Sequence, residues 1–275
     1  MTTTTTWRPP THAPTASYGA LVTIEIRRYA MRRLPRAALA SLGALTLAVW
    51  FLISPRFVMS VGSQADTAEM LGAPVIAMTV LMMLLLYATA ATFIGADSSS
   101  GALSQWLTFA PDRTKVFWSK ATAVAVCSVI VAGAVLALTM VVAFATFVAS
   151  GVHVPSILTA LPYAARGLVA CVLAALGGYA VSAAFGRTAA APLAIAVYVA
   201  LFVTRNVLFS AGWEYDWRFG PAVSLMAFLL GGTWVTQHPF HQAYVTWQQG
   251  AAILALLVAT ALLASWAWFC RRDHD

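Results

Sequence analysis

The chain has 275 residues, of which 61% are hydrophobic and only 9% are charged. Soluble domains carry charge on roughly a quarter of their residues, so this composition excludes a soluble globule and indicates a membrane protein. The formal net charge of +7 would suggest nucleic-acid binding in a soluble protein. In a membrane protein, basic residues flank and orient the spans, so we expect no nucleic-acid partner.

The N-terminal region has two parts. Residues 1–16, MTTTTTWRPPTHAPTA, contain no apolar core, which predicts a disordered cytoplasmic tail rather than a secretory signal. Residues 18–34 combine apolar side chains with arginines and are predicted to form an amphipathic helix lying in the membrane plane. Its membrane-surface arginines are Arg27, Arg28, Arg32 and Arg33. A simple basic flank of the first span is the alternative interpretation.

Six segments have about the 20 apolar residues that a transmembrane helix requires. They are 37–53, 73–94, 121–149, 163–184, 189–210 and 251–269. A shorter apolar patch, 221–235, contains Gly231-Gly232 near its end, and this glycine pair weakens a helix. We expect that patch to form a re-entrant or interfacial hairpin on the outer side rather than a seventh span. The aromatic residues of 212–247 fit the level of the lipid headgroups.

The Lys and Arg residues orient these spans. With the N-terminus inside, twelve of them lie in inner segments and four in outer ones. An even number of spans also returns Arg271 and Arg272 to the cytoplasm. We therefore predict an all-α, multi-pass protein of the cell (plasma) membrane, with both termini cytoplasmic. Residues 17–275 are expected to form its six-helix transmembrane domain.

Several catalytic motifs are absent from the sequence. It contains no GxxxxGK[ST] phosphate loop, no GxSxG elbow and no HExxH metal motif. His238 and His241 have the spacing of half a metal site, but Pro239 between them favours an interfacial loop. The spans also lack a chain of acidic residues, which argues against an ion-driven transporter. We expect no catalytic residue, metal or cofactor in this chain, and any energy for transport must come from a partner.

The polar stretch between the second and third predicted spans is the best candidate for binding a soluble partner. Residues 95–120 read GADSSSGALSQWLTFAPDRTKVFWSK. Leu103, Trp106 and Leu107 offer an apolar ridge of the kind that fills a groove on a partner. Gly101 permits a sharp turn and Pro111 ends a helix. An ordinary amphipathic loop lying on lipid is the alternative.

This stretch resembles the signature of ABC-2 type transporter permeases, the membrane subunits of ATP-driven exporters. The positions that carry the resemblance are Asp97, Gly101, Leu103, Leu107, Pro111, Arg113 and Lys120. Asp97 stands where the family usually has Glu, and Ala102 stands where Thr is usual. The predicted in-plane helix, the six spans and the outer re-entrant segment are similar to that family's elbow helix and overall architecture.

The resemblance implies that a coupling helix in this loop docks on a separate ATP-binding cassette subunit, which holds the ATP and Mg²⁺. The residues implied in coupling are the seven above together with Trp106. A second permease, identical or related, would complete a dimer in the lipid bilayer. Small residues on the third and fourth spans would permit close helix approach: Gly133, Ala134, Ala174, Ala175, Gly177 and Gly178.

The function implied is export of an amphiphilic substrate that is drug-like, peptide or lipid-like. Two other functions stay open. One is a non-transporting membrane anchor or sensor subunit. The other is a membrane-embedded lipid-modifying enzyme, which would need polar catalytic residues gathered at one membrane face.

Overall fold

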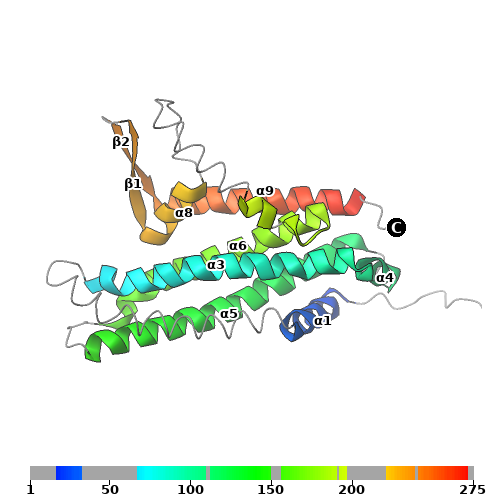
Figure 1. Ribbon diagram of the computed structural model, residues 1–275, viewed down its shortest axis with the longest axis horizontal. Helices are drawn as coiled ribbons and strands as arrows, with labels where there is room; N and C mark the ends of the chain where they lie inside the picture. Colours follow the sequence, from blue (N-terminus) through cyan, green and yellow to red (C-terminus); the bar gives the residue numbers. More distant parts are fainter. Residues whose placement is uncertain are drawn as a thin grey trace, which may run out of the picture.

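The computed structural model describes residues 17–32, 67–109, 112–149, 156–190, 192–196, 221–238 and 241–271. The predicted tail, the predicted first span and most of the predicted fifth span lie outside these residues. Four long helices lie side by side along the longest axis of the molecule (Figure 1): α3 (Thr67–Ser99), α5 (Arg113–Ala149), α6 (Leu161–Phe185) and α9 (Trp247–Arg271). A short 3-10 helix, η1 (Ile157–Ala160), leads into α6.

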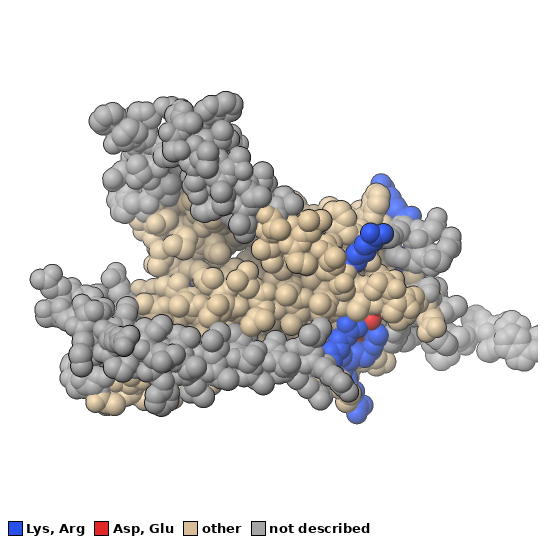
Figure 2. All heavy atoms as spheres, in the orientation of Figure 1, with Lys and Arg blue, Asp and Glu red and all other residues tan. Residues whose placement is uncertain are grey.

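These four helices coincide with four of the predicted spans, the second, third, fourth and sixth. Each is long and apolar enough to cross a membrane, over Gly72–Ser99, Arg113–Ala149, Leu161–Phe185 and Trp247–Arg271. Large apolar side chains such as Ile130 and Leu256 are exposed on the outside of the bundle. Figure 2 shows a face on which uncharged residues cover the length of the helices and Lys and Arg gather at one end. The chain is therefore a helical membrane protein.

All four long helices extend beyond the apolar segments that predicted them, α3 and α5 by the most. α3 continues to Ser99, and α5 begins at Arg113 rather than at residue 121. Asp112 caps α5, since its Oδ1 accepts a hydrogen bond of 3.1 Å from the Lys115 N–H. That bond is the main reason why the pKa of Asp112 lies below its ordinary value. The stretch 95–120 is thus mostly helical, with a separate short helix, α4 (Ala102–Phe109), between α3 and α5.

α3 and α6 run in the same direction and pack closely along their length. A Cβ on Gly95 would lie 2.7 Å from the Thr188 backbone nitrogen, and one on Gly178 would overlap the Tyr87 carbonyl. Gly178 and Ala175, predicted to allow close helix approach, are therefore used within this chain. Gly133 on α5 differs, because no described atom outside its own helix lies within 4 Å of a Cβ placed there.

Aromatic side chains join α5, α6 and α9 near the end at which α5 begins. The ring of Phe117 lies 5.3 Å from that of Tyr179 and 5.6 Å from that of Phe269. The Tyr179 hydroxyl donates to the Phe117 carbonyl at 2.8 Å. This contact satisfies a fully buried hydroxyl and fixes the three helices relative to one another.

The prediction of an all-α fold is wrong in one segment. After α8 (Pro221–Leu230), strands β1 (Gly232–His238) and β2 (His241–Thr246) form an antiparallel hairpin. Gly231 and Gly232 have φ of 90° and 137°, a region that favours glycine, and they end α8 where the sequence predicted a helix to weaken. The β-branched and aromatic residues that follow favour strands. α8 itself has 10 residues, and it packs against α6 and the start of α9.

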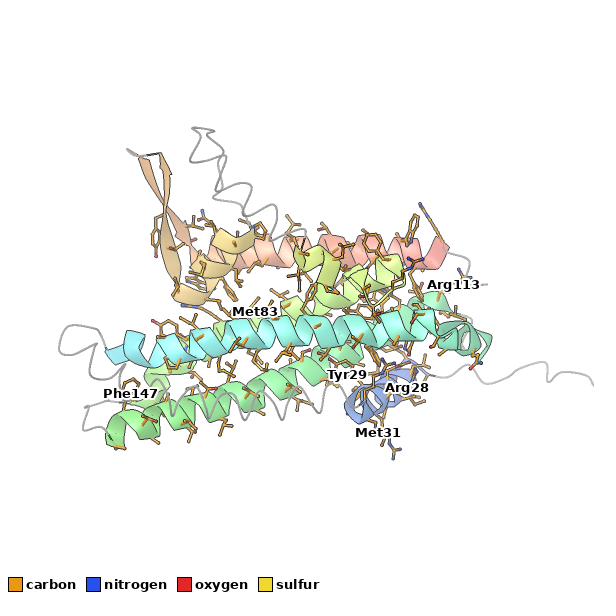
Figure 3. All side chains as sticks on the ribbon, viewed as in Figure 1. Arg28, Tyr29, Met31, Met83, Arg113 and Phe147 are labelled. Atoms are coloured by element: carbon orange, nitrogen blue, oxygen red, sulfur yellow. The ribbon has the colours of Figure 1, made fainter. Side chains whose placement is uncertain are left out.

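The N-terminal helix α1 (Tyr18–Met31) crosses the long helices near one end of the bundle (Figure 1). Ser17 caps its N-terminus by accepting a hydrogen bond from the Ala20 N–H. Its buried face consists of Leu21, Glu25 and Tyr29, which follow one another at i,i+4 spacing. Figure 3 places Arg28 and Tyr29 of α1 at the same end as Arg113, and Phe147 of α5 at the opposite end.

Candidate functional site

Charged side chains from three helices meet where α3 ends and α5 begins. We call this set the charge cluster, and its members are Glu25 and Arg28 of α1, Arg32 directly after α1, Asp97 of α3 and Lys120 of α5. Lys120 is fully buried, with 0% exposure, and Glu25 and Asp97 are buried as well. A charge this deep is costly unless it is paired and hydrogen-bonded.

Each buried charge in the cluster has at least two partners. Lys120 Nζ donates to Asp97 Oδ2 at 2.7 Å and to Glu25 Oε2 at 3.2 Å. Arg32 Nη2 donates to Asp97 Oδ1 at 2.6 Å, and Arg28 bridges the two acids at 3.1 Å to Glu25 and 3.4 Å to Asp97. Three cations against two anions leave one net positive charge. Because every member of the cluster is shared, removal of one weakens the pairing of the others.

Polar and aromatic contacts add to the attachment of α1. The Tyr29 hydroxyl donates to Thr89 Oγ1 at 3.1 Å, and the Tyr29 ring meets Phe93 edge-on at 5.0 Å. The Tyr29 phenol is protonated at neutral pH and can donate this bond, and burial raises its pKa further. At the other end of α1, the Tyr18 hydroxyl lies 2.8 Å from Thr122 Oγ1 on α5. α1 is therefore fastened to both α3 and α5.

The structure separates the coupling residues predicted in 95–120. Asp97 and Lys120 belong to the buried charge cluster, so they face the interior of the protein. Gly101 and Leu103 frame α4: Gly101 has φ of 71°, which confirms the predicted sharp turn. Arg113, at the first position of α5, donates from Nη1 to the Cys270 carbonyl at 3.2 Å and thereby joins the start of α5 to the end of α9.

The predicted apolar ridge of α4 points partly into the protein itself. Leu103 is 2% exposed and belongs to the main hydrophobic core, and Leu107 packs against that core. Gln105 on the same helix is exposed. Trp106 lies in α4, with its side chain outside what the structure describes, and Pro111 lies outside the described residues altogether. A partner that approached α4 would therefore meet Gln105 before it met Leu103.

The membrane-surface arginines also separate into groups. Arg28 and Arg32 are half-buried members of the charge cluster, whereas Arg27 is exposed. Arg33 lies outside the described residues. An amphipathic helix would carry its arginines on the face opposite its apolar residues. The structure differs, since Ile24 and Met31 are exposed beside Arg27.

Glu25 is the member of the cluster that sequence reasoning missed. The sequence does indicate its position, because Glu25 stands four residues from both Leu21 and Tyr29 and so shares their helix face. An acid on the apolar face of a basic helix indicates a buried cation nearby. The contacts of Arg32 with the Thr92 carbonyl and of Tyr29 with Thr89 had no comparable signal, because they depend on how α1 crosses α3.

The cluster joins α1, α3 and α5. Its acids are occupied by cations from the chain itself, and its oxygens are already hydrogen-bonded. No group of three or more His, Cys, Asp or Glu that could hold a metal occurs among the described residues.

No protein-family model matches the chain, and no curated protein matches it at a significant level. The resemblance to ABC-2 permeases therefore rests on the loop residues and on the span pattern.

Proposed function

We propose that this chain is the transmembrane permease subunit of an ATP-binding cassette exporter, as its resemblance to ABC-2 permeases implies. One observation carries the proposal. The two ends of the connection that contains α4, Asp97 and Lys120, are ion-paired to each other and to α1. A displacement of α4 by a bound partner would thus be transmitted to α1, α3 and α5 together.

Six spans account for where the described helices begin and end. Arg166, near the start of α6, lies over the ring of Trp247 at the start of α9, 5.5 Å from its centre. The end of α9 lies beside the start of α5, through Arg113 and Cys270. α6 and α9 therefore run in the same direction, and a single span between them, the predicted fifth, would return the chain to the starting end. A first span between α1 and the start of α3 fits in the same way (Figure 1).

The charged end of the bundle is proposed to face the cytoplasm. Lys120, Arg113 and the arginines of α1 lie at this end, as Figures 2 and 3 show in part. Cytoplasmic ends of membrane proteins are rich in Lys and Arg. Both termini then lie inside, α1 serves as the in-plane elbow helix, and α8 with its hairpin forms the outer re-entrant segment.

The exposed part of α4 is proposed to contact the ATP-binding subunit. Asp97 and Lys120 then contribute indirectly, by holding α4 and α1 in place, while the ATP and Mg²⁺ belong to the partner. A second permease, identical or related, completes the transporter. The cargo proposed is an amphiphilic compound that is drug-like, peptide or lipid-like.

Site-directed cross-linking tests the docking surface directly. We would replace Gln105 by Cys in a Cys270→Ser background, because Cys127 and Cys171 are buried and Cys270 is not. The variant is co-expressed with an ATP-binding subunit encoded by a neighbouring gene. We expect Gln105→Cys to cross-link to that subunit. Leu158→Cys, 66% exposed near the start of α6, is the matched control and should not cross-link. Equal cross-linking from both positions, or none from Gln105→Cys, would contradict the proposal.

A further inference from the structure

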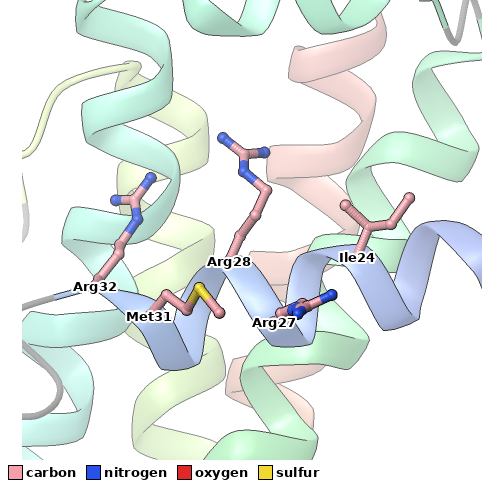
Figure 4. A pocket seen from close by; sticks show the side chains of 5 residues that line it. All are labelled: Ile24, Arg27, Arg28, Met31 and Arg32. Carbon is pink, nitrogen blue, oxygen red and sulfur yellow. The ribbon is translucent and has the colours of Figure 1, made fainter.

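The exposed side of α1 carries an open cavity of about 530 Å³. It is lined by Ile24, Arg27, Arg28, Met31 and Arg32, and we call it the α1 groove. Figure 4 shows these side chains along one stretch of α1, with Arg28 and Arg32 extending to the same side. Three guanidinium groups therefore lie next to two exposed apolar side chains.

The electrostatics of the α1 groove favour an anion. Arg28 and Arg32 engage Glu25 and Asp97, but their side chains remain 28% and 26% exposed. The charge cluster already has one net positive charge, and Arg27 adds another. Within the part of the chain that the structure describes, no acid pairs with Arg27. Arginine presents a planar set of donors that suits phosphate oxygens.

The apolar half of the α1 groove selects among anions. Ile24 and Met31 are 44% and 57% exposed, and neither would stabilise a free phosphate ion. They would contact the acyl chains of a lipid whose phosphate lies on the arginines. The groove also lies at the charged end of four helices that can span a membrane, the level at which anionic headgroups occur.

We propose that the α1 groove binds an anionic phospholipid, with the phosphate on Arg27, Arg28 and Arg32 and the acyl chains over Ile24 and Met31. The bonds of Arg28 and Arg32 to Asp97 hold two of the three arginines in position before the lipid arrives. This inference rests on the placement of α1 at the membrane surface proposed above. It does not depend on the transport function or on an ATP-binding subunit.

Lipid retention by the purified full-length chain tests the proposal. The protein is extracted from membranes, supplied with equal amounts of phosphatidylglycerol and phosphatidylcholine, and its bound lipids are counted by native mass spectrometry. We expect the wild-type chain to retain phosphatidylglycerol preferentially. Arg27→Gln should lower that preference about five-fold, because one arginine near an anionic lipid surface contributes about 1 kcal/mol. Arg271→Gln, an exposed arginine at the same end but outside the groove, should change nothing.

Three further measurements separate the possible outcomes. The thermal unfolding midpoint of Arg27→Gln should equal that of the wild type, so that a loss of lipid cannot be attributed to misfolding. Inorganic phosphate in excess should displace little phosphatidylglycerol, and Met31→Gln should weaken its retention. Equal retention of both lipids by the wild-type chain, unchanged retention by Arg27→Gln, or full displacement by inorganic phosphate would each overturn the proposal. Cross-linking from Gln105→Cys would be unaffected by these results, so failure here is distinguishable from failure of the exporter proposal.

Discussion

Lys120 is the residue on which the charged end of the molecule depends most. It is fully buried, it forms ion pairs with both Glu25 and Asp97, and its Nζ lies 4.7 Å from the centre of the Phe93 ring. A buried ion pair contributes little net stability by comparison with an apolar pair. Removing Lys120 is a different matter, because Glu25 and Asp97 then stay buried with only the half-buried Arg28 and Arg32 as partners.

Lys120→Met is therefore expected to destabilise the protein by about 3–5 kcal/mol. The measurement is denaturant-induced unfolding in mixed micelles. Lys115→Met is the matched control, since Lys115 forms an exposed pair with Asp112 at 3.3 Å, and such pairs contribute about 0–1 kcal/mol. Similar losses for the two variants would show that the charge cluster does not carry the stability assigned to it.

Asp97 is the position at which this chain departs from the usual glutamate of ABC-2 permeases. Its carboxylate contacts Arg32 at 2.6 Å and Lys120 at 2.7 Å, which leaves little room for a longer side chain. We expect Asp97→Glu to cost about 1–3 kcal/mol through overpacking. Asp97→Asn should cost more, because three cations then share only Glu25. The same unfolding assay ranks the two variants. An Asp97→Glu variant that is less stable than Asp97→Asn would contradict this order.

At the scale of the elements, the contact between α3 and α6 is the closest helix packing described. Gly178→Ala would bring a Cβ against the Tyr87 carbonyl, a backbone atom that cannot move aside easily. We expect a loss of about 1–3 kcal/mol. Gly133→Ala, where nothing described lies within 4 Å, should be neutral or stabilising by up to about 1 kcal/mol. Unfolding midpoints of the two variants test the prediction, and a neutral Gly178→Ala would refute it.

Hydrophobicity predicted the existence of the long helices but not their ends. A span of about 20 apolar residues marks what lies in lipid. The N-terminal end of α5 extends beyond that span, through residues 113–120, and is capped by Asp112. The strands after α8 were missed, because the aromatic residues of 212–247 were interpreted by their affinity for headgroups and not by their preference for strands.

Local sequence patterns predicted some residues of the candidate site but not the tertiary contacts that those residues make. Asp97 and Lys120 were found by their pattern, and Gly101 was correctly placed at a turn. Which way Leu103 faces depends on how α4 folds back against the core, and this is a tertiary property. The pairing of Asp97 with α1 joins residues more than sixty positions apart, and no local pattern specifies it.

At the scale of the whole molecule, the topology proposed above has six spans with both termini on the charged side. Cysteine labelling in intact cells and inverted vesicles tests this topology. Asp273→Cys should react only from the cytoplasmic side and Leu158→Cys only from outside, each in a Cys270→Ser background. Labelling of Asp273→Cys only from outside would require an odd number of spans.

The ATP-binding partner is the central claim, and co-purification with ATP hydrolysis tests it most directly. The tagged chain is co-expressed with the ATP-binding subunit of a neighbouring gene, purified and returned to a lipid bilayer. We predict a stable complex whose Mg²⁺-dependent ATP hydrolysis disappears when the catalytic residue of that subunit is replaced. Purification of the chain without the subunit, or a complex that hydrolyses no ATP, would contradict the exporter assignment and favour a membrane anchor or sensor.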